Sequence, residues 1–137
     1  MSNEFTRNIQ DAAKIVSVAL PAAGANVSTP TIDLEQVVGG LLENVCFELS
    51  IPATPSLVDA KVITCKVFDG AASNSLAVID PLISTTITGV ATSQGGPAKS
   101  IRFRLPPTAR RYIAVNVAVE SGGGSNIAVD TTLKLLF

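Results

Sequence analysis

Residues 112–120 read Tyr-Ile-Ala-Val-Asn-Val-Ala-Val-Glu, and this stretch decides the fold class. Ile113, Val115, Val117 and Val119 are branched and apolar, whereas the positions between them carry smaller or polar side chains. Alternation with a period of two is typical of a β-strand that buries one face. We therefore predict a strand from Tyr112 to Glu120 whose branched side chains face the core.

The same alternation recurs on both sides of this strand, separated by prolines, glycines and short polar runs. Apolar and polar side chains alternate in residues 45–51, 58–69, 101–105 and 127–137, and shorter β-prone runs occupy residues 15–20, 31–34, 76–79 and 83–90. Asp69-Gly70 and the Ala-Ala-Ser-Asn-Ser that follows predict a turn. No long stretch has a helical period. The pattern predicts an all-β fold, an antiparallel jelly-roll-like β-sandwich of about eight strands.

The chain of 137 residues fits one domain, because a chain near ~150 residues can bury roughly 68–70% of its unfolded surface. Residues 1–13 show no period and are predicted to form an N-terminal arm. Residues 14–137 are then the single β-sandwich domain. Within the arm, Phe5 is either an incidental exposed residue or an anchor for a neighbouring surface.

Residue types that most enzymes need are missing. The sequence contains no histidine, no tryptophan, one tyrosine and two cysteines. Without histidine there is no Ser-His-Asp or Cys-His catalytic group and no histidine-ligated zinc. The acidic residues are not spaced as a calcium loop, and paired glycines such as Gly39-Gly40 lack the context of a phosphate loop. We predict that the protein is not an enzyme and has no metal, cofactor or small-molecule substrate.

The chain shows neither a secretory leader nor an apolar run of about 18–20 residues, so we expect no signal peptide and no membrane contact. Cys46 and Cys65 fall on opposite faces of neighbouring predicted strands, which disfavours a disulfide between them. Two reduced thiols are typical of a protein assembled inside a cell.

Half of the ten basic residues lie between positions 99 and 111, at Lys99, Arg102, Arg104, Arg110 and Arg111. Arg102 and Arg104 share one face of a predicted strand and Arg110 and Arg111 open the next, so a short turn could bring the four arginines together. They could pair within the chain, dock on an acidic protein surface or contact nucleic acid. Nucleic acid is least favoured, because readers of single strands add aromatic stacking platforms. The carboxylates considered for pairing within the chain are Glu48, Asp69 and Asp130.

The predicted exposed strand faces are rich in alanine, threonine, serine and valine and poor in charge. Charged residues make up 15% of the chain, against about 25% in an average domain, and the formal net charge is −1. Flat, weakly charged β surfaces promote association between molecules. Burying them against copies of the chain or another protein removes that risk, so the surface predicts a structural assembly protein.

Several segments follow one another in an order that is familiar: Ile15–Leu20, Leu49-Ser50-Ile51-Pro52, Val62–Phe68 before Asp69-Gly70, Leu105-Pro106-Pro107, and Arg110-Arg111-Tyr112-Ile113-Ala114-Val115-Asn116-Val117. A glycine-rich run at 122–124 and a last strand into Leu133-Lys134-Leu135 close the series. In this order the chain resembles the small capsid cement, or decoration, proteins of short-tailed phages, of the Bordetella-podophage type.

The resemblance implies a jelly-roll protein without catalytic residues that acts in the virion. Such a protein oligomerises on the exterior of the icosahedral head, after assembly in the host cytoplasm, and bridges subunits of the major capsid protein against the pressure of the DNA. On this reading the partners are the major capsid protein and a second or third copy of the chain. The expected partner contacts are Arg102, Arg104, Arg110, Arg111 and Phe5.

Two other roles stay open on the sequence. A neck or connector component of the virion would have the same composition, and its copy number per particle would separate it from a cement protein. A head fibre that binds a receptor or glycan would need exposed aromatic side chains, which are scarce in this chain. An enzyme on a jelly-roll scaffold would lack its histidine metal ligands.

Overall fold

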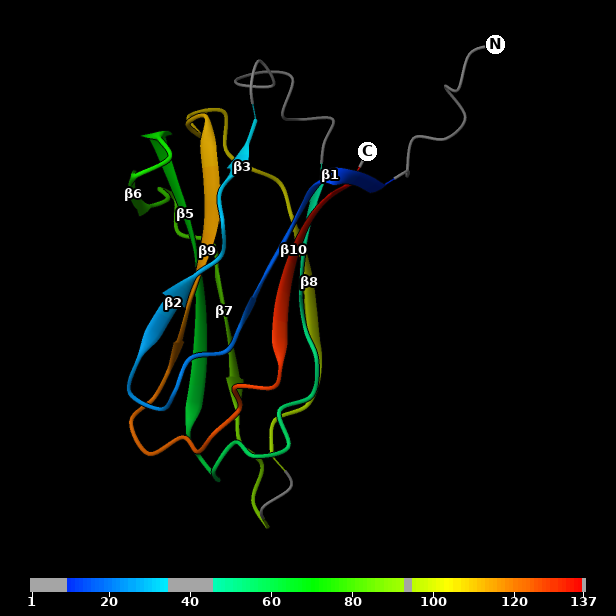
Figure 1. Ribbon diagram of the computed structural model, residues 1–137, viewed down its shortest axis with the longest axis vertical. Coiled ribbons are helices and arrows are strands. Elements are labelled where there is room, and N and C mark those ends of the chain that lie inside the picture. Colours follow the sequence, from blue (N-terminus) through cyan, green and yellow to red (C-terminus); the bar gives the residue numbers. More distant parts are fainter. Residues whose placement is uncertain (1–9, 35–45, 93–94, 137) are drawn as a thin grey trace.

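Two antiparallel β-sheets face each other across an apolar core (Figure 1). The structure is a computed structural model, and it describes residues 10–34, 46–92 and 95–136. One sheet has four strands in the order β1 (Gln10–Ala19), β10 (Asp130–Leu136), β4 (Cys46–Ile51) and β8 (Lys99–Phe103). In the six-stranded sheet, β9 (Tyr112–Val119) pairs with β2 (Asn26–Ser28), β3 (Ile32–Asp33) and β5 (Val62–Ala72), and β5 also pairs with β6 (Ser75–Val78) and β7 (Ser84–Thr88). The predicted all-β antiparallel sandwich is confirmed.

The strand order fits a jelly roll. If β2 with β3 and β6 with β7 are each counted as one position, the described chain has eight positions in sequence order: β1, β2/β3, β4, β5, β6/β7, β8, β9 and β10. The first then lies beside the eighth, the second beside the seventh, the third beside the sixth and the fourth beside the fifth. A long antiparallel hairpin wrapped into two sheets produces this order. The predicted number of about eight strands corresponds to these positions.

The core is built by the alternation that the sequence predicted. In β9, Ile113, Val115, Val117 and Val119 are buried, and in β4 the same holds for Phe47, Leu49 and Ile51. The Phe47 ring stacks on Phe103 of the neighbouring β8, with 5.6 Å between ring centroids. Burying each large apolar side chain contributes about 1.5–3 kcal/mol, so these two rows are a substantial part of what stabilises the sandwich.

Several predicted boundaries are wrong. The first strand begins at Gln10, which pairs with Leu136 of β10, so residues 10–13 of the expected arm lie within β1. Asp69-Gly70 lies inside β5, next to a register shift in its pairing with β6. Asp69 is buried there, and residue 70 lies so close to the Ser75 carbonyl oxygen that a Cβ would overlap it. The last strand begins at Asp130, and Ile127 is an exposed residue of the preceding connection.

Four connections meet at one end of the sandwich, the lower end in Figure 1. We call this the four-loop end, and its described connections are residues 20–25, 52–61, 89–92 with 95–98, and 120–129. The connection 104–111 crosses between the sheets at the opposite end. The described residues include no helix of the length and apolarity needed to cross a membrane.

Candidate interaction surfaces

The four arginines predicted as partner contacts do not form one cluster. Arg102 lies in β8 of the four-stranded sheet, whereas Arg110 and Arg111 precede β9 of the six-stranded sheet. The two strands belong to different sheets, so the connection between them separates the arginines instead of gathering them. Three of the four bind carboxylates of other strands. For these three, pairing within the chain is the reading that the structure supports.

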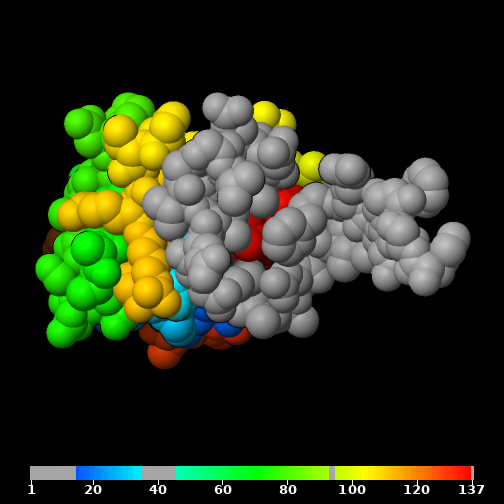
Figure 2. All heavy atoms as spheres, turned by 90° about the horizontal axis from the view of Figure 1, so that it is seen from above, coloured from blue at the N-terminus to red at the C-terminus, as the bar shows by residue number. Residues whose placement is uncertain are grey.

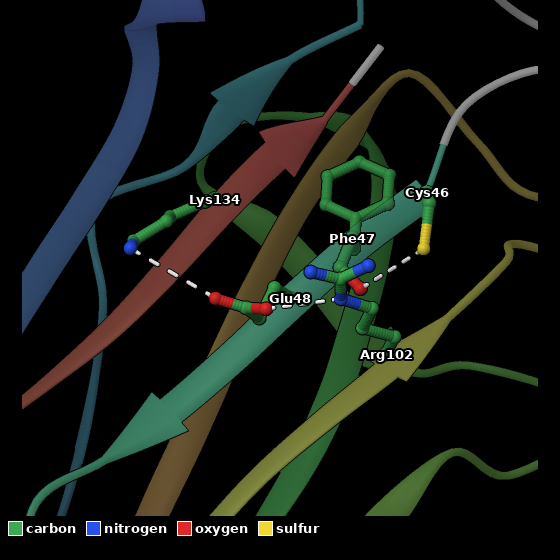
Figure 3. Close-up of polar contacts among 5 residues, drawn as sticks. All are labelled: Cys46, Phe47, Glu48, Arg102 and Lys134. Atoms are coloured by element: carbon green, nitrogen blue, oxygen red, sulfur yellow. Dashed lines mark hydrogen bonds and ion pairs between the residues drawn. The ribbon is translucent and has the colours of Figure 1, made fainter. Parts of the chain in front are cut away.

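Arg102 belongs to a row of alternating charges on the outer face of the four-stranded sheet (Figure 3). The register places Lys134 of β10, Glu48 of β4 and Arg102 side by side. Arg102 Nε donates to Glu48 Oε2 at 3.0 Å, and Lys134 Nζ lies 3.9 Å from Glu48 Oε1. Exposed pairs of this kind contribute only about 0–1 kcal/mol. Their effect is to reduce the charge of the face.

Arg110 binds Asp69, which is the only buried charged residue in the described part of the chain. Asp69 Oδ2 accepts from the Arg110 backbone N at 2.9 Å, and Oδ1 accepts from Nη2 at 2.9 Å. The Asp69 backbone oxygen accepts a third bond from Nη2 at 3.1 Å. Figure 2 shows the segment before β9, in yellow and orange, lying against the green β5–β6 region. The pair therefore fastens the connection 104–111 to β5.

Burial of the carboxyl group raises the pKa of Asp69, but the hydrogen bonds and the charge of Arg110 outweigh it. The pKa of Asp69 therefore lies below its usual range, and the same contact raises the pKa of Arg110. A carboxylate stabilised in this way stays ionised in the folded protein.

Acid should remove the stability that this pair supplies. Because the pKa of Asp69 is lower in the folded chain, its contribution is complete above the unfolded value of ~3.9 and is lost as the pH falls through the lower folded value. We expect the difference in unfolding free energy between wild type and Asp69→Asn to be constant above about pH 5 and to shrink below about pH 4. Urea unfolding at each pH measures it, and a difference that persists to about pH 2 would contradict the pairing.

Arg111 and Tyr112 form a second ordered group near the same end. Arg111 Nε and Nη2 donate to Asp33 Oδ1 and Oδ2 at 2.7 and 2.9 Å, and the guanidinium carbon lies 5.3 Å from the centroid of the Tyr112 ring. The Leu34 backbone N donates to the Arg111 carbonyl oxygen at 2.8 Å. The chain's single tyrosine is thus covered on one face by its neighbour, so it offers only one face for stacking on a ligand.

Arg104 and Phe5 complete the set of predicted contacts. Arg104 is exposed and forms no ion pair with any residue in 10–34, 46–92 or 95–136. Among the four arginines, Arg104 is the one that has no ion pair within the described chain. Phe5 lies outside the described residues.

The four-loop end carries three of the most exposed large apolar side chains. Val58, Val90 and Ile127 are 45%, 47% and 59% exposed, and they come from three different connections. A Cβ built at Gly124 would lie 3.4 Å from Val58 Cγ2, so the connection that carries Ile127 contacts the one that carries Val58. Apolar side chains exposed on adjacent loops make this end a candidate interaction site.

The backbone of the four-loop end is cross-linked. Thr54 and Gly96 exchange two backbone hydrogen bonds at 2.9 Å, and the Val58 N donates to the Gly123 oxygen at 3.2 Å. Ala60 and Thr92, the non-glycine residues with left-handed backbone in the described chain, also lie here, with φ of 64° and 73°. Strained backbone persists only where its surroundings hold it, and it concentrates at binding sites. The loops that carry the exposed side chains are therefore ordered before any partner binds.

The cysteines are unpaired, as predicted, although they do not lie on neighbouring strands. Cys46 is in β4 of one sheet and Cys65 is in β5 of the other. Burial raises the pKa of the Cys65 thiol to about 12, against a small opposing effect of Lys99. A thiol with such a pKa is unreactive at neutral pH. The described residues contain no group of three or more potential metal ligands.

The sequence-based hypothesis missed Val58, Val90 and Ile127. It placed all three in strands: Ile127 in the last strand, Val90 at the end of the run 83–90, and Val58 at the start of the run 58–69. The strand β5 in fact begins at Val62, and β7 ends at Thr88. The glycines and serines next to Ile127, in Ser-Gly-Gly-Gly-Ser-Asn at 121–126, were the signal that this part belongs to a loop. Periodicity alone does not separate an exposed apolar residue from a core residue.

Comparison with known proteins gives no family. No protein-family model and no curated protein matches the chain. Among solved structures it is similar to a protein described as "Family 16 Carbohydrate Binding Module-2", with 10% sequence identity over 88% of this chain and 72% of that one, and a TM-score of 0.33. A likeness of this size carries no argument about function.

Proposed function

We propose that this protein is a capsid cement, or decoration, protein of a phage virion. It oligomerises as a homodimer or homotrimer on the exterior of the icosahedral head and bridges neighbouring major capsid protein subunits, so that the shell resists the pressure of the packaged DNA. Its role is structural and uses no substrate or cofactor. The resemblance of the sequence to such proteins supplies the partner.

The observation that carries the proposal is the preformed apolar surface of the four-loop end. Val58, Val90 and Ile127 are exposed there on loops that backbone hydrogen bonds already hold in place. A surface that is rigid before binding loses little conformational entropy when it docks, so even a small patch contributes to affinity. Interface centres are also apolar and poor in charge.

Several weak contacts are sufficient if they act together. A specific protein interface usually buries ~1,000 Å² or more, and a contact through a few loop residues binds weakly on its own. An oligomer that touches several capsid subunits raises the effective concentration of each further contact. The affinity of the oligomer can then exceed that of a single contact by about 10²–10⁴.

The test is co-sedimentation of the purified protein with heads of the candidate phage that lack it. We expect saturation at hundreds of copies per head and survival of the decorated heads at temperatures that rupture bare ones. Saturation at about a dozen copies would instead favour a connector at a single vertex. Heads that bind no protein, together with binding to glycans, would favour the head-fibre alternative.

Substitutions at the four-loop end should separate docking from folding. Ile127→Asp places a charge in the proposed apolar contact, and we expect its affinity for heads to fall at least about tenfold. Ser17→Asp adds the same charge to the exposed outer face of β1 and should bind as wild type. Arg104→Ala changes the opposite end of the sandwich, so it should also bind as wild type if the four-loop end is the docking surface. Equal head binding by Ile127→Asp and wild type would exclude this end as the docking surface.

A further inference from the structure

The strand β7 forms an open edge of the six-stranded sheet. Within the described chain it pairs with β5 alone, and it runs down to the four-loop end (Figure 1). The side chains on its outer face are small, polar and exposed, and they belong to Ser84, Thr86 and Thr88. An edge strand presents a row of backbone N–H and C=O groups with which a further strand can pair.

The backbone bonds at the two ends of β7 establish which of its groups face outward. The Val67 N donates to the Ile83 carbonyl oxygen at 2.9 Å. At the other end, the Gly89 N donates to the Lys61 carbonyl oxygen at 2.9 Å. Ile83 and Gly89 therefore direct their backbone groups to β5, and in an antiparallel pair so does every second residue between them. The residues whose N–H and C=O groups point away from the sheet are Ser84, Thr86 and Thr88.

One side chain contacts the middle of this edge. Lys99 Nζ, from β8 of the other sheet, donates to the Thr86 carbonyl oxygen at 2.9 Å, as the outward direction of that group requires. No other hydrogen bond between described residues reaches the outward backbone groups of β7. Because Lys99 is exposed, water or a partner can replace its bond with little net loss.

Lys99 also determines which strand can pair here. Two β7 edges paired with each other around Thr86 would bring two Lys99 ammonium groups together, which opposes association between copies. A strand that carries carboxylates would instead gain an ion pair with Lys99. The other exposed charges near the start of β7, Lys66 and Asp80, lie at the same level of the sheet and have opposite signs. The charge of this edge is therefore set by Lys99.

We infer that the edge of β7 is a docking site for an extended acidic segment of a partner protein, which adds a strand to the six-stranded sheet. The outward groups of Ser84, Thr86 and Thr88 bind the backbone of the segment, and Lys99 binds one of its carboxylates. The three outward residues span about 13 Å, so a segment of about five residues fills the edge. Main-chain bonds accept many sequences, whereas Lys99 selects the acidic ones.

The edge of β7 adjoins the surface on which the proposed function depends. β7 ends at Thr88, and Val90 follows in the connection that belongs to the four-loop end. One partner segment can therefore contact Val90 and continue along β7. That this partner is the major capsid protein rests on the proposed function; the edge site itself rests on the backbone groups of β7 and on Lys99.

The test uses two end-blocked peptides of seven residues, one alternating valine with glutamate and the other alternating valine with lysine. Each is titrated into the isotope-labelled full chain while the amide signals of β7 are followed by NMR. We expect the glutamate peptide to shift the signals of Ser84, Thr86 and Thr88 and to slow amide exchange at Thr86 at least about tenfold. It should bind at least about tenfold more tightly than the lysine peptide.

Two substitutions of Thr86 separate backbone pairing from side-chain contact. Thr86→Pro removes the outward N–H, and an edge strand tolerates it because that group does not bond to β5. We expect Thr86→Pro to bind the glutamate peptide at least about tenfold more weakly than wild type. Thr86→Val keeps the N–H and should bind as wild type. Circular dichroism and melting temperature establish that each variant is folded.

Lys99→Glu tests the charge and leaves the backbone of β7 unchanged. It should reverse the preference, so that the lysine peptide binds more tightly than the glutamate peptide. The inference is wrong if neither peptide shifts the β7 signals of wild type, if folded Thr86→Pro binds as wild type, or if Lys99→Glu still prefers the glutamate peptide. The experiment uses no phage heads, so its failure is distinct from a failure of the proposed cement function, which head binding alone decides.

Discussion

Replacing Asp69 by alanine lowers the free energy of unfolding by about 2–3 kcal/mol, the largest effect that we expect from removing one polar side chain. The Asp69 carboxylate is 6% exposed and accepts two hydrogen bonds from Arg110. Without it, the backbone N–H of Arg110 loses its acceptor, and the connection 104–111 keeps only the bond from Arg110 Nη2 to the backbone oxygen of residue 69. Urea unfolding at neutral pH measures the loss.

Arg102→Ala is the matched control for this prediction. Arg102 also pairs with a carboxylate, but its side chain is 69% exposed and Glu48 keeps Lys134 as a second neighbour. We expect a cost of no more than about 0.5 kcal/mol. If both variants lose the same stability, burial of the Asp69 carboxylate is not what makes its pair important.

Replacing Gly124 by alanine should disrupt the four-loop end. Gly124 has φ of +82°, and a Cβ on it would overlap the carbonyl oxygen of Ser56. Left-handed backbone costs an alanine about 1–2 kcal/mol, and displacement of the Ser56 backbone raises the total to about 3 kcal/mol or more. The shift also moves Val58, so on the proposed function Gly124→Ala binds heads less well. Chemical unfolding measures the loss of stability, and amide exchange at Val58 measures the shift of its backbone.

Gly122→Ala separates the two causes. Gly122 has nearly the same backbone, with φ of +79°, but its added Cβ would meet only the flexible Lys61 side chain, 3.4 Å from Cε. It should therefore lose only the ~1–2 kcal/mol of the left-handed conformation and keep the exchange rate at Val58. Equal losses in the two variants would show that contact with Ser56 is unimportant.

Local sequence predicted the strands that form the core and failed where the chain interacts with distant segments. The alternation at 45–51 and 112–120 was sufficient because each strand buries one face whatever its neighbours are. Asp69-Gly70 has the composition of a turn, yet Asp69 is held in β5 by Arg110, which lies far along the chain. Ile127 continues an apolar alternation, but it lies in a loop.

The arginines show the same limit for the candidate site. The sequence identified a basic segment and named two of the carboxylates that it meets, Glu48 and Asp69. It did not predict that Arg111 pairs with Asp33, 78 positions away, or that Arg104 has no ion pair in the described part of the chain. Which arginine is available to a partner depends on which strands become neighbours, and that is a property of the topology.

The sequence by itself determined the all-β class, the sandwich with its core rows and the unpaired cysteines, because these follow from local periodicity and composition. Only the tertiary structure decided which charges are neutralised, which loops meet at the four-loop end and which apolar side chains remain exposed there. The physical reason is the range of the interactions: a strand's buried face is set by every second residue, whereas an ion pair or an exposed patch is set by segments that the sheet order brings together.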